Sequence, residues 1–312
     1  MVSPVSAQNP LPAQSPKIAA SVSSNTNVLR FGIHTSRIGN FDPAYAKGSE
    51  DYTYADMVFN SILRYVPGDS SRLEPDLALK MPEFILQHGK QIWTVQLRRG
   101  IFFHGGPYNT PYELTAEDVV YSLKKTADPL RSSKFGKYAG MKFEMTGSHT
   151  LEIIVEKPMS PLFFLPLLAN REGGFIVSKQ AIEKGGVDNF KQHPVGTGPF
   201  MFSRYTAQDK LVLTANKNYF RGKPQLRGVE IHFIPDNKQR EDAYKEGRLD
   251  VIYGVGDPGW IERMETWPET IVDVFGPGFT GLFHFNTSIK PMDDLRVRQA
   301  ICLALDRELF LS

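Results

Sequence analysis

Segments with the hydrophobic period of a strand alternate along this chain with segments that have the period of a helix. Apolar residues occupy every second position in 29–33, 93–97 and 151–155, so each segment would present one apolar and one polar face. Further strands are expected at 200–202, 211–215, 229–233 and 249–253. Apolar residues at helical spacing predict helices over 55–63, 116–123, 238–246 and 297–305. Because the two kinds of segment are mixed rather than separated, the sequence predicts an α/β or mixed α+β fold.

Two of the predicted helices carry signals beyond their apolar faces. Thr115 and Asp118 have the spacing of a capping box at the start of the helix over 116–123. The helix over 297–305 is strongly periodic and runs almost to the last residue, Ser312. We expect its apolar face to pack against residues outside this sequence.

The charge balance argues against a general attraction to polyanions. The chain has 312 residues, of which 36 are Lys or Arg and 34 are Asp or Glu, for a formal net charge of +2. This near balance gives no overall field that would recruit nucleic acid or an anionic membrane, so neither partner is predicted. The most basic stretch, 124–137, is interpreted as a solvated helix end and loop.

Cys302 is the only cysteine, which excludes an intramolecular disulfide, a thiolate metal cluster and a paired-cysteine redox centre. Such thiol-poor sequences are compatible with export from the cytoplasm. The best candidate for a membrane span, 162–169, is too short and is interrupted by Pro166.

The first 27 residues are mostly Ser, Ala, Pro, Asn and Gln without a hydrophobic period, which predicts a disordered leader over 1–27. This leader holds neither the apolar core of a secretion signal nor a cysteine for a lipid anchor. Val5-Ser6-Ala7 would suit a signal-peptidase site, which suggests that an apolar signal segment was removed before Met1. A start codon followed by an unstructured tail explains the segment equally well, so both interpretations stay open.

The sequence predicts no catalytic residue, no metal ligand and no cofactor. Its seven histidines are scattered, and no two stand at the i, i+3 or i, i+4 spacing that would aim two imidazoles at one metal. His104 is interpreted as a hydrogen-bonding residue of a loop or strand end. Gly196-Thr197-Gly198 resembles the start of a dinucleotide fingerprint, but Pro199 follows where a helix should open. A tight turn that enters the next strand is therefore expected at this motif.

A series of longer motifs in fixed order points to one family. LEPDLA at 73–78 is followed by WTVQLRRG at 93–100 and by LTAEDVVYSL at 114–123. The series continues with PVGTGPF at 194–200, NYFRGKP at 218–224, GRLD at 247–250 and DLRVRQAI at 294–301. From about Val28 to the C-terminus, this series resembles the family-5 bacterial extracellular solute-binding proteins, the oligopeptide, dipeptide and nickel-binding group of ABC importers.

The resemblance implies a periplasmic-binding-protein-like clamshell of type II, with two lobes. The first lobe would comprise 28–65 and 194–280, and a smaller α/β subdomain over 66–193 would be inserted into it. The second lobe would begin at about 281. Residues 281–312 would then be only its start, and most of that lobe would be missing from this sequence.

The resemblance also implies a function and a site. It implies a monomeric receptor, not an enzyme, that captures a peptide or related small solute outside the cytoplasmic membrane, in the periplasm or at the membrane's outer face. This receptor would pass its ligand to ABC permease subunits. Nickel chelates, sugars and opines stay open as ligands, and so does a fragment that binds no ligand. Surfaces of the first lobe that are expected to face the cleft supply the candidate contacts Tyr45, Tyr52, Tyr253, Gly254, Phe279 and Thr280.

Overall fold

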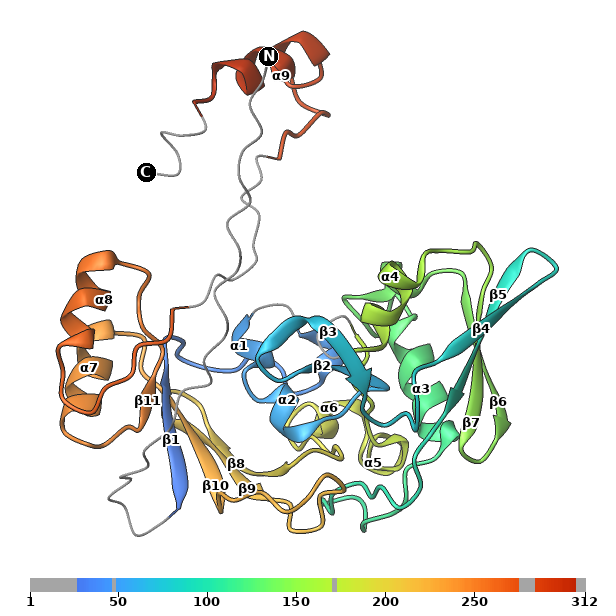
Figure 1. Cartoon of the computed structure of the whole chain (residues 1–312), viewed down its shortest axis with the longest axis horizontal. Helices are drawn as coiled ribbons and strands as arrows, with labels where there is room; N and C mark the ends of the chain where they lie inside the picture. The colour runs from blue at the N-terminus through green and yellow to red at the C-terminus, as the bar shows by residue number, and fades with distance from the viewer. Residues whose placement is uncertain (1–26, 47–48, 170–172, 275–283, 307–312) are drawn as a thin grey trace. The chain divides into compact units, whose positions relative to one another are not determined.

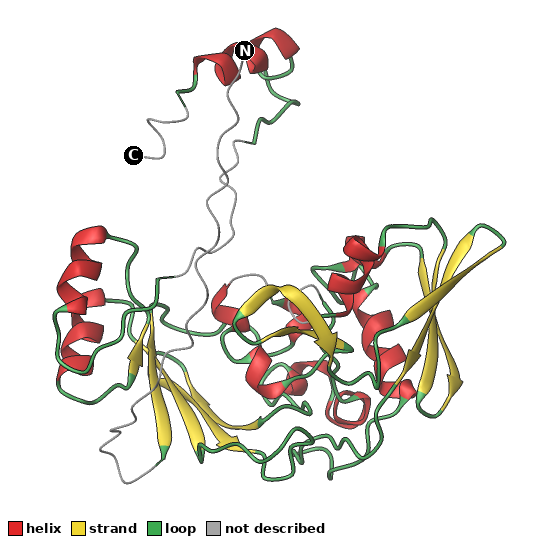
Figure 2. Cartoon of the chain, in the orientation of Figure 1, coloured by secondary structure: helices red, strands yellow, loops and turns green. Residues whose placement is uncertain are grey.

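The computed structural model describes residues 27–46, 49–169, 173–274 and 284–306 (Figure 1). Contacts between Cα atoms divide the chain into two compact units, 1–254 and 255–312. Strands gather into two main groups in the first unit, with helices between and beside them (Figure 2). The mixed fold predicted from the alternating periods is confirmed.

The first group is a five-stranded sheet with the strand order β11-β1-β10-β9-β8 (Figure 1). β1 pairs in parallel with β10 and β11, whereas β9 pairs antiparallel with β10 and β8. Its predicted alternation is confirmed, because Leu211, Leu213, Val229 and Ile231 are buried. β11 is shorter than the predicted strand over 249–253. The strands are β1 (Val28–Ile33), β8 (Phe200–Thr206), β9 (Lys210–Ala215), β10 (Gly228–Phe233) and β11 (Val251–Ile252).

The second group is an antiparallel four-stranded sheet with the order β4-β5-β7-β6, and a smaller hairpin lies beside it. Helix α3 (Ala116–Thr126) packs against β6 and β7, and the predicted capping box of Thr115 and Asp118 is present at its start. The sheet strands are β4 (Glu83–Gln87), β5 (Lys90–Gln96), β6 (Met141–Gly147) and β7 (Thr150–Val155), and the hairpin strands are β2 (Leu63–Val66) and β3 (Asp69–Pro75).

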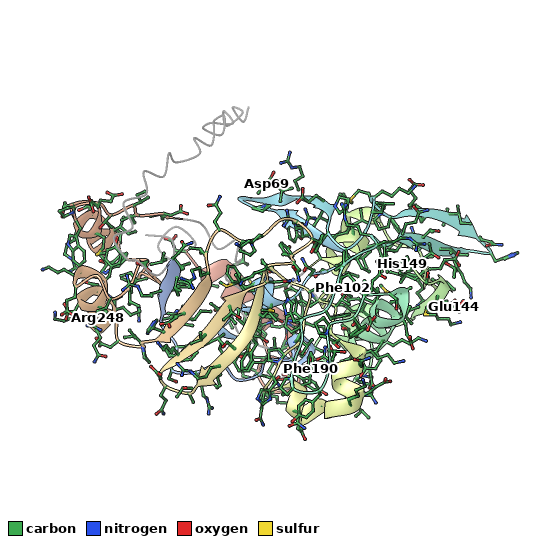
Figure 3. All side chains as sticks on the ribbon, turned by 90° about the horizontal axis from the view of Figure 1, so that it is seen from below. Asp69, Phe102, Glu144, His149, Phe190 and Arg248 are labelled. Atoms are coloured by element: carbon green, nitrogen blue, oxygen red, sulfur yellow. The ribbon has the colours of Figure 1, made fainter. Side chains whose placement is uncertain are left out.

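The remaining helices are short, and most of them surround the two sheets of the first unit. Those of the first unit are η1 (Pro43–Tyr45), α1 (Ser49–Tyr52), α2 (Ala55–Val58), η2 (Phe135–Tyr138), α4 (Pro161–Phe164), η3 (Leu165–Leu168), α5 (Lys179–Gly185), α6 (Val187–Phe190) and α7 (Asn237–Lys245). Phe190 is buried, whereas Glu144 and Arg248 are exposed and Asp69 is partly exposed at the periphery (Figure 3).

The helix predicted over 55–63 is wrong in its second half, because α2 ends at Val58. The amide of Gly198 donates to the Val58 carbonyl at 2.9 Å. A Cβ atom at Gly196 would lie 2.0 Å from the same oxygen, so only glycine allows this close approach of two backbones. The Gly196-Thr197-Gly198 motif is therefore a turn that packs on the end of α2. Ile62 and Leu63 stay buried, but Leu63 belongs to β2.

A buried ion pair joins the segment after β1 to helix α3. Lys125 Nζ lies 2.6 Å and 2.7 Å from the two carboxylate oxygens of Asp42, and the two side chains are 2% and 0% exposed. The interpretation of 124–137 as solvated is wrong at Lys125. The adjacent cavity measures about 10 Å³, which is room for about one water molecule and none for a solute. Because no solute fits beside it, we assign the Lys125–Asp42 ion pair a structural role rather than a role in binding.

A second buried polar cluster ties the ends of the β2–β3 hairpin to segments beside the five-stranded sheet. The carboxylate of Asp76 accepts from Asn60 Nδ2 at 2.8 Å and from Arg221 Nε at 3.0 Å. Thr197 Oγ1 donates to the amide oxygen of Asn60 at 3.0 Å. Because these residues come from distant parts of the chain, they fix the ends of the β2–β3 hairpin to segments that flank the five-stranded sheet.

The second unit contains α8 (Pro258–Glu265) and α9 (Leu295–Ala304). The predicted helix over 297–305 is confirmed, and Asp294 caps it by accepting from the amide of Arg296 at 2.8 Å. None of the residues of α9 is buried. In the part of the chain that the structure describes, no helix is long and apolar enough to cross a membrane.

Candidate ligand-binding site

The carboxyl ends of β1, β10 and β11 meet at one edge of the five-stranded sheet because these strands run parallel. His34 follows β1, Ile234 follows β10 and Tyr253 follows β11. In open sheets with parallel strands, ligands bind just outside the carboxyl ends of the strands. We call this edge the carboxyl edge and take it as the candidate ligand-binding site.

Two exposed aromatic rings stand next to each other at the carboxyl edge. The rings of His34 and Tyr253 have centroids 4.5 Å apart and are tilted by 40°. Tyr253 is 46% exposed, and its amide donates to the Gly32 carbonyl at 2.8 Å. This backbone bond extends the β1–β11 pairing and fixes the position of the ring. The pair offers an apolar surface with a hydroxyl and an imidazole, which suits an amphipathic solute.

Arg240 of α7 holds the backbone of the carboxyl edge in place. Its side chain is buried, and Nε donates to the carbonyl of Tyr253 at 3.0 Å. Nη1 donates to the carbonyls of Ile234 and Pro235 at 2.7 Å and 2.8 Å, and Nη2 donates to Asn237 Oδ1 at 3.1 Å. Because the guanidinium is occupied by its own chain, Arg240 is a positioning residue rather than a ligand contact.

An ion pair on the same sheet keeps β11 in register with β1. Arg30 Nη2 lies 2.6 Å from Asp250 Oδ1, and Arg30 Nε donates to Asp250 Oδ2 at 3.0 Å. The amide of Arg30 also donates to this carboxylate at 2.7 Å. Asp250 directly precedes β11, so these bonds fix the short strand that carries Tyr253 at its end.

Tyr45 and Tyr52 lie in the segment after the loop from β1, and both rings contact lysines. The Tyr45 ring is half-buried between Lys125 Nζ, at 5.3 Å from its centroid, and Lys191 Nζ, at 4.9 Å. Burial, helped by the charge of Asp42, raises the pKa of Tyr45. Tyr52 is buried, and its hydroxyl donates to the Ala46 carbonyl at 3.2 Å. Tyr52 therefore offers little surface, and both tyrosines stay predictions as ligand contacts.

Of the other three predicted contacts, one lies at the carboxyl edge and two lie outside the described residues. Gly254 follows Tyr253 at the carboxyl edge and is half-buried. Phe279 and Thr280 lie outside the described residues. Sequence reasoning missed His34, although its position directly after the strand over 29–33 was a usable signal. It also missed Arg240, whose role depends on main-chain carbonyls that leave no trace in the sequence.

The histidines and acids described here do not gather into a metal site. Within residues 27–46, 49–169, 173–274 and 284–306, no group of three or more His, Cys, Asp or Glu side chains could hold a metal ion. His104 is a buried structural residue, as its place in the sequence predicts, and its Nε2 donates to the Gly198 carbonyl at 2.9 Å. Burial lowers the pKa of His104 to about 4, so its ring is neutral at pH 7.

Comparison with known proteins gives one consistent match. Residues 72–312 match the family described as bacterial extracellular solute-binding proteins, family 5. A di/tripeptide-binding protein 2 of Pseudomonas aeruginosa is 26% identical over 290 residues, which cover 87% of this chain and 53% of the relative. The chain thus spans about half the length of this relative.

Two solved structures have the same fold. One is the binding protein MoaA of A. tumefaciens R10 in complex with mannopinic acid, which is 34% identical at a TM-score of 0.81, with 91% of this chain and 56% of that chain covered. The other is a periplasmic binding protein, DppA of Helicobacter pylori, in complex with the peptide STSA. It is 25% identical at a TM-score of 0.69, and the match covers 79% of this chain and 50% of that chain.

Proposed function

Since this chain belongs to the bacterial extracellular solute-binding proteins of family 5, we propose that it serves as the substrate-binding component of an ABC importer. In this role it captures peptides outside the cytoplasmic membrane, in the periplasm or at its outer face, and delivers them to permease subunits. The observation that carries the proposal is the exposed pair His34 and Tyr253 at the carboxyl edge. Relatives named for di- and tripeptides, and a similar structure in complex with a peptide, support the choice of ligand.

The carboxyl edge suits a peptide for a physical reason. The Tyr253 ring covers the apolar part of a side chain, while its hydroxyl and the His34 imidazole hydrogen-bond to the peptide's backbone or terminus. Arg240 and the Arg30–Asp250 pair hold this surface rigid before the ligand arrives, so little order is lost on binding. A role in binding rather than catalysis is supported by the relatives, which are named as binding proteins.

An opine is the second candidate ligand. The structure bound to mannopinic acid is 34% identical to this chain, against 25% for the structure bound to a peptide. Both ligand classes carry a carboxylate and an amine nitrogen, so both can use the same hydroxyl and imidazole. The two candidates therefore differ in ligand but share the carboxyl edge as the site.

Isothermal titration calorimetry with a panel of di- and tripeptides, and with mannopinic acid, tests the proposal. We expect at least one compound to bind, and we expect Tyr253→Ala to weaken it about tenfold, which corresponds to about 1.4 kcal/mol. Tyr108→Ala is the matched control, because Tyr108 is another exposed tyrosine and lies between β5 and α3, away from the carboxyl edge. Heat from no compound, or an equal loss in both variants, would contradict the proposal.

A further inference from the structure

A pocket of about 410 Å³ opens beside β8, the edge strand of the five-stranded sheet opposite β11. This volume lies within the range of small-molecule sites. β8 and β11 are opposite edge strands of the sheet, four strand spacings or roughly 19 Å apart, so the pocket is separate from the pair His34 and Tyr253. Its lining residues are Ile38, Gly39, Phe41, Lys191, Gln192, His193, Phe202, Ser203, Arg204 and Tyr205.

The wall formed by β8 is aromatic because of a bulge in that strand. Phe202 pairs with Leu213 and Tyr205 with Leu211, and the register shifts between Phe202 and Arg204. The extra residue brings Phe202 and Tyr205 to the same face of the strand, although they are three positions apart. Both rings pack edge-to-face on Phe41, with centroids 5.3 Å and 4.9 Å from it.

Hydrogen bonds hold the opposite wall, the loop after β1, in a fixed position. The Tyr205 hydroxyl donates to the Ile38 carbonyl at 3.2 Å and lies 3.3 Å from the Ile38 amide. The amide of Phe41 donates to the Lys191 carbonyl at 3.3 Å, and the amide of Gly39 donates to Asp51 Oδ1 at 2.9 Å. The pocket is therefore formed before any ligand binds.

The charge around the pocket is positive. Lys191 and Arg204 line it together with the imidazole-bearing His193, and none of the ten lining residues is acidic. Lys191 pairs with Asp188 at 3.0 Å, but the Asp188 side chain is 93% exposed, and such pairs contribute little. Arg204 is exposed and takes part in none of the ion pairs found among the described residues. Both cations are thus available to an anion.

We propose that this pocket is a second ligand site, which binds a small anion that carries a flat apolar group, such as an aryl phosphate or an aryl carboxylate. The apolar group packs on Phe41, Phe202 and Tyr205. The anionic group lies toward Lys191 and Arg204. The site does not depend on the function proposed for the carboxyl edge, because the two share no residue.

Titration of the protein with phenyl phosphate, benzoate, inorganic phosphate and phenol, followed by calorimetry and by amide NMR shifts, tests this site. We expect phenyl phosphate or benzoate to bind, and inorganic phosphate and phenol to bind at least about tenfold more weakly, because each offers only half of the interaction. The amides of Gly39 and Ser203 should shift on binding, since both residues line the pocket.

Two double variants separate the pocket from general charge effects. Lys191→Gln with Arg204→Gln should weaken binding about tenfold or more, while Lys217→Gln with Arg227→Gln removes the same charge from exposed residues elsewhere and should leave it unchanged. Tyr253→Ala should also leave it unchanged. The proposal is overturned by absence of binding at low-millimolar ligand, by equal losses in the two double variants, or by shifts confined to other residues.

Discussion

Helices α3 and α9 carry similar local signals and have opposite environments. α3 has 11 residues behind a capping box, and α9 has 10 residues behind the capping side chain of Asp294. Eight residues of α3 are buried, and none of α9 is. A cap and an amphipathic pattern therefore predict that a helix forms, but they do not say what its apolar face packs against.

The burial of α3 includes charged and polar side chains, each with a partner from another segment. Lys125 pairs with Asp42, and Asp118 accepts from the Tyr112 hydroxyl at 2.6 Å. The same hydroxyl lies 3.0 Å from Ser178 Oγ, the residue that caps α5. α3 is thus the point at which several segments of the first unit are fixed together. Among the described residues, the side chains of Asp294 and Arg298 tie α9 to its own neighbours in sequence.

The largest expected effect comes from the buried ion pair. Lys125→Ala leaves the Asp42 carboxylate buried without its cation, so we expect the free energy of unfolding to fall by about 3–5 kcal/mol. Urea denaturation of the variant and the wild type measures this. A double variant, Lys125→Met with Asp42→Leu, should recover most of the loss, and a failure to recover it would contradict the role given to the pair.

Replacing one leucine in each helix, Leu123 in α3 and Leu303 in α9, tests the difference in packing between the two helices most simply. Leu123 of α3 is fully buried, so Leu123→Ala should cost about 2–5 kcal/mol through lost burial and the cavity left behind. The same denaturation experiment applied to both helices gives the contrast directly. A small cost at Leu123 would mean that α3 is not packed as described.

The interior of the first unit should also lose stability in acid, because of His104. Its pKa is about 4 in the folded state against 6.5 ordinarily, so between these values the unfolded chain binds more protons than the folded one. This contribution is fully present above pH 6.5 and is lost as the pH falls through 6.5 toward 4, by about 3 kcal/mol. His104→Gln should remove that part of the dependence in denaturation curves recorded from pH 7 to pH 4.

The smallest effect is expected at α9. Leu303 is 87% exposed, so Leu303→Ala should change the free energy of unfolding by no more than about 0.5 kcal/mol. Its comparison with Leu123→Ala holds the chemical change constant and varies only the environment. A loss at Leu303 as large as that at Leu123 would show that the two helices are packed alike.

Local patterns predicted the strands and helices that depend on neighbours in sequence. The strands over 211–215 and 229–233 were predictable because their buried side chains alternate strictly. The end of α2 was not predictable from local pattern, because the amide that donates to the Val58 carbonyl belongs to the distant residue Gly198. Lys125 was read as solvated for the same reason, since Asp42 lies 83 positions away. Errors thus arose where a distant segment supplied the deciding contact.

In the candidate site too, local pattern could indicate single residues but not contacts between distant segments. Tyr253 and Gly254 could be predicted from their place after a strand, and His34 could have been found in the same way. The pairing of His34 with Tyr253 depends on β1 lying beside β11, which the sequence does not reveal. The β8 pocket depends on a bulge and on a loop from far along the chain, so no local pattern indicated it.

Photoaffinity labelling tests the central claim, that a solute binds at the carboxyl edge, most directly. A dipeptide bearing a diazirine would be photolysed with the protein, and the labelled residues would be mapped by mass spectrometry with excess unlabelled dipeptide as competitor. We predict competable labelling in the tryptic peptides that contain His34 or Tyr253, since these rings are exposed side by side. Competable labelling that appears only elsewhere in the chain would contradict the claim.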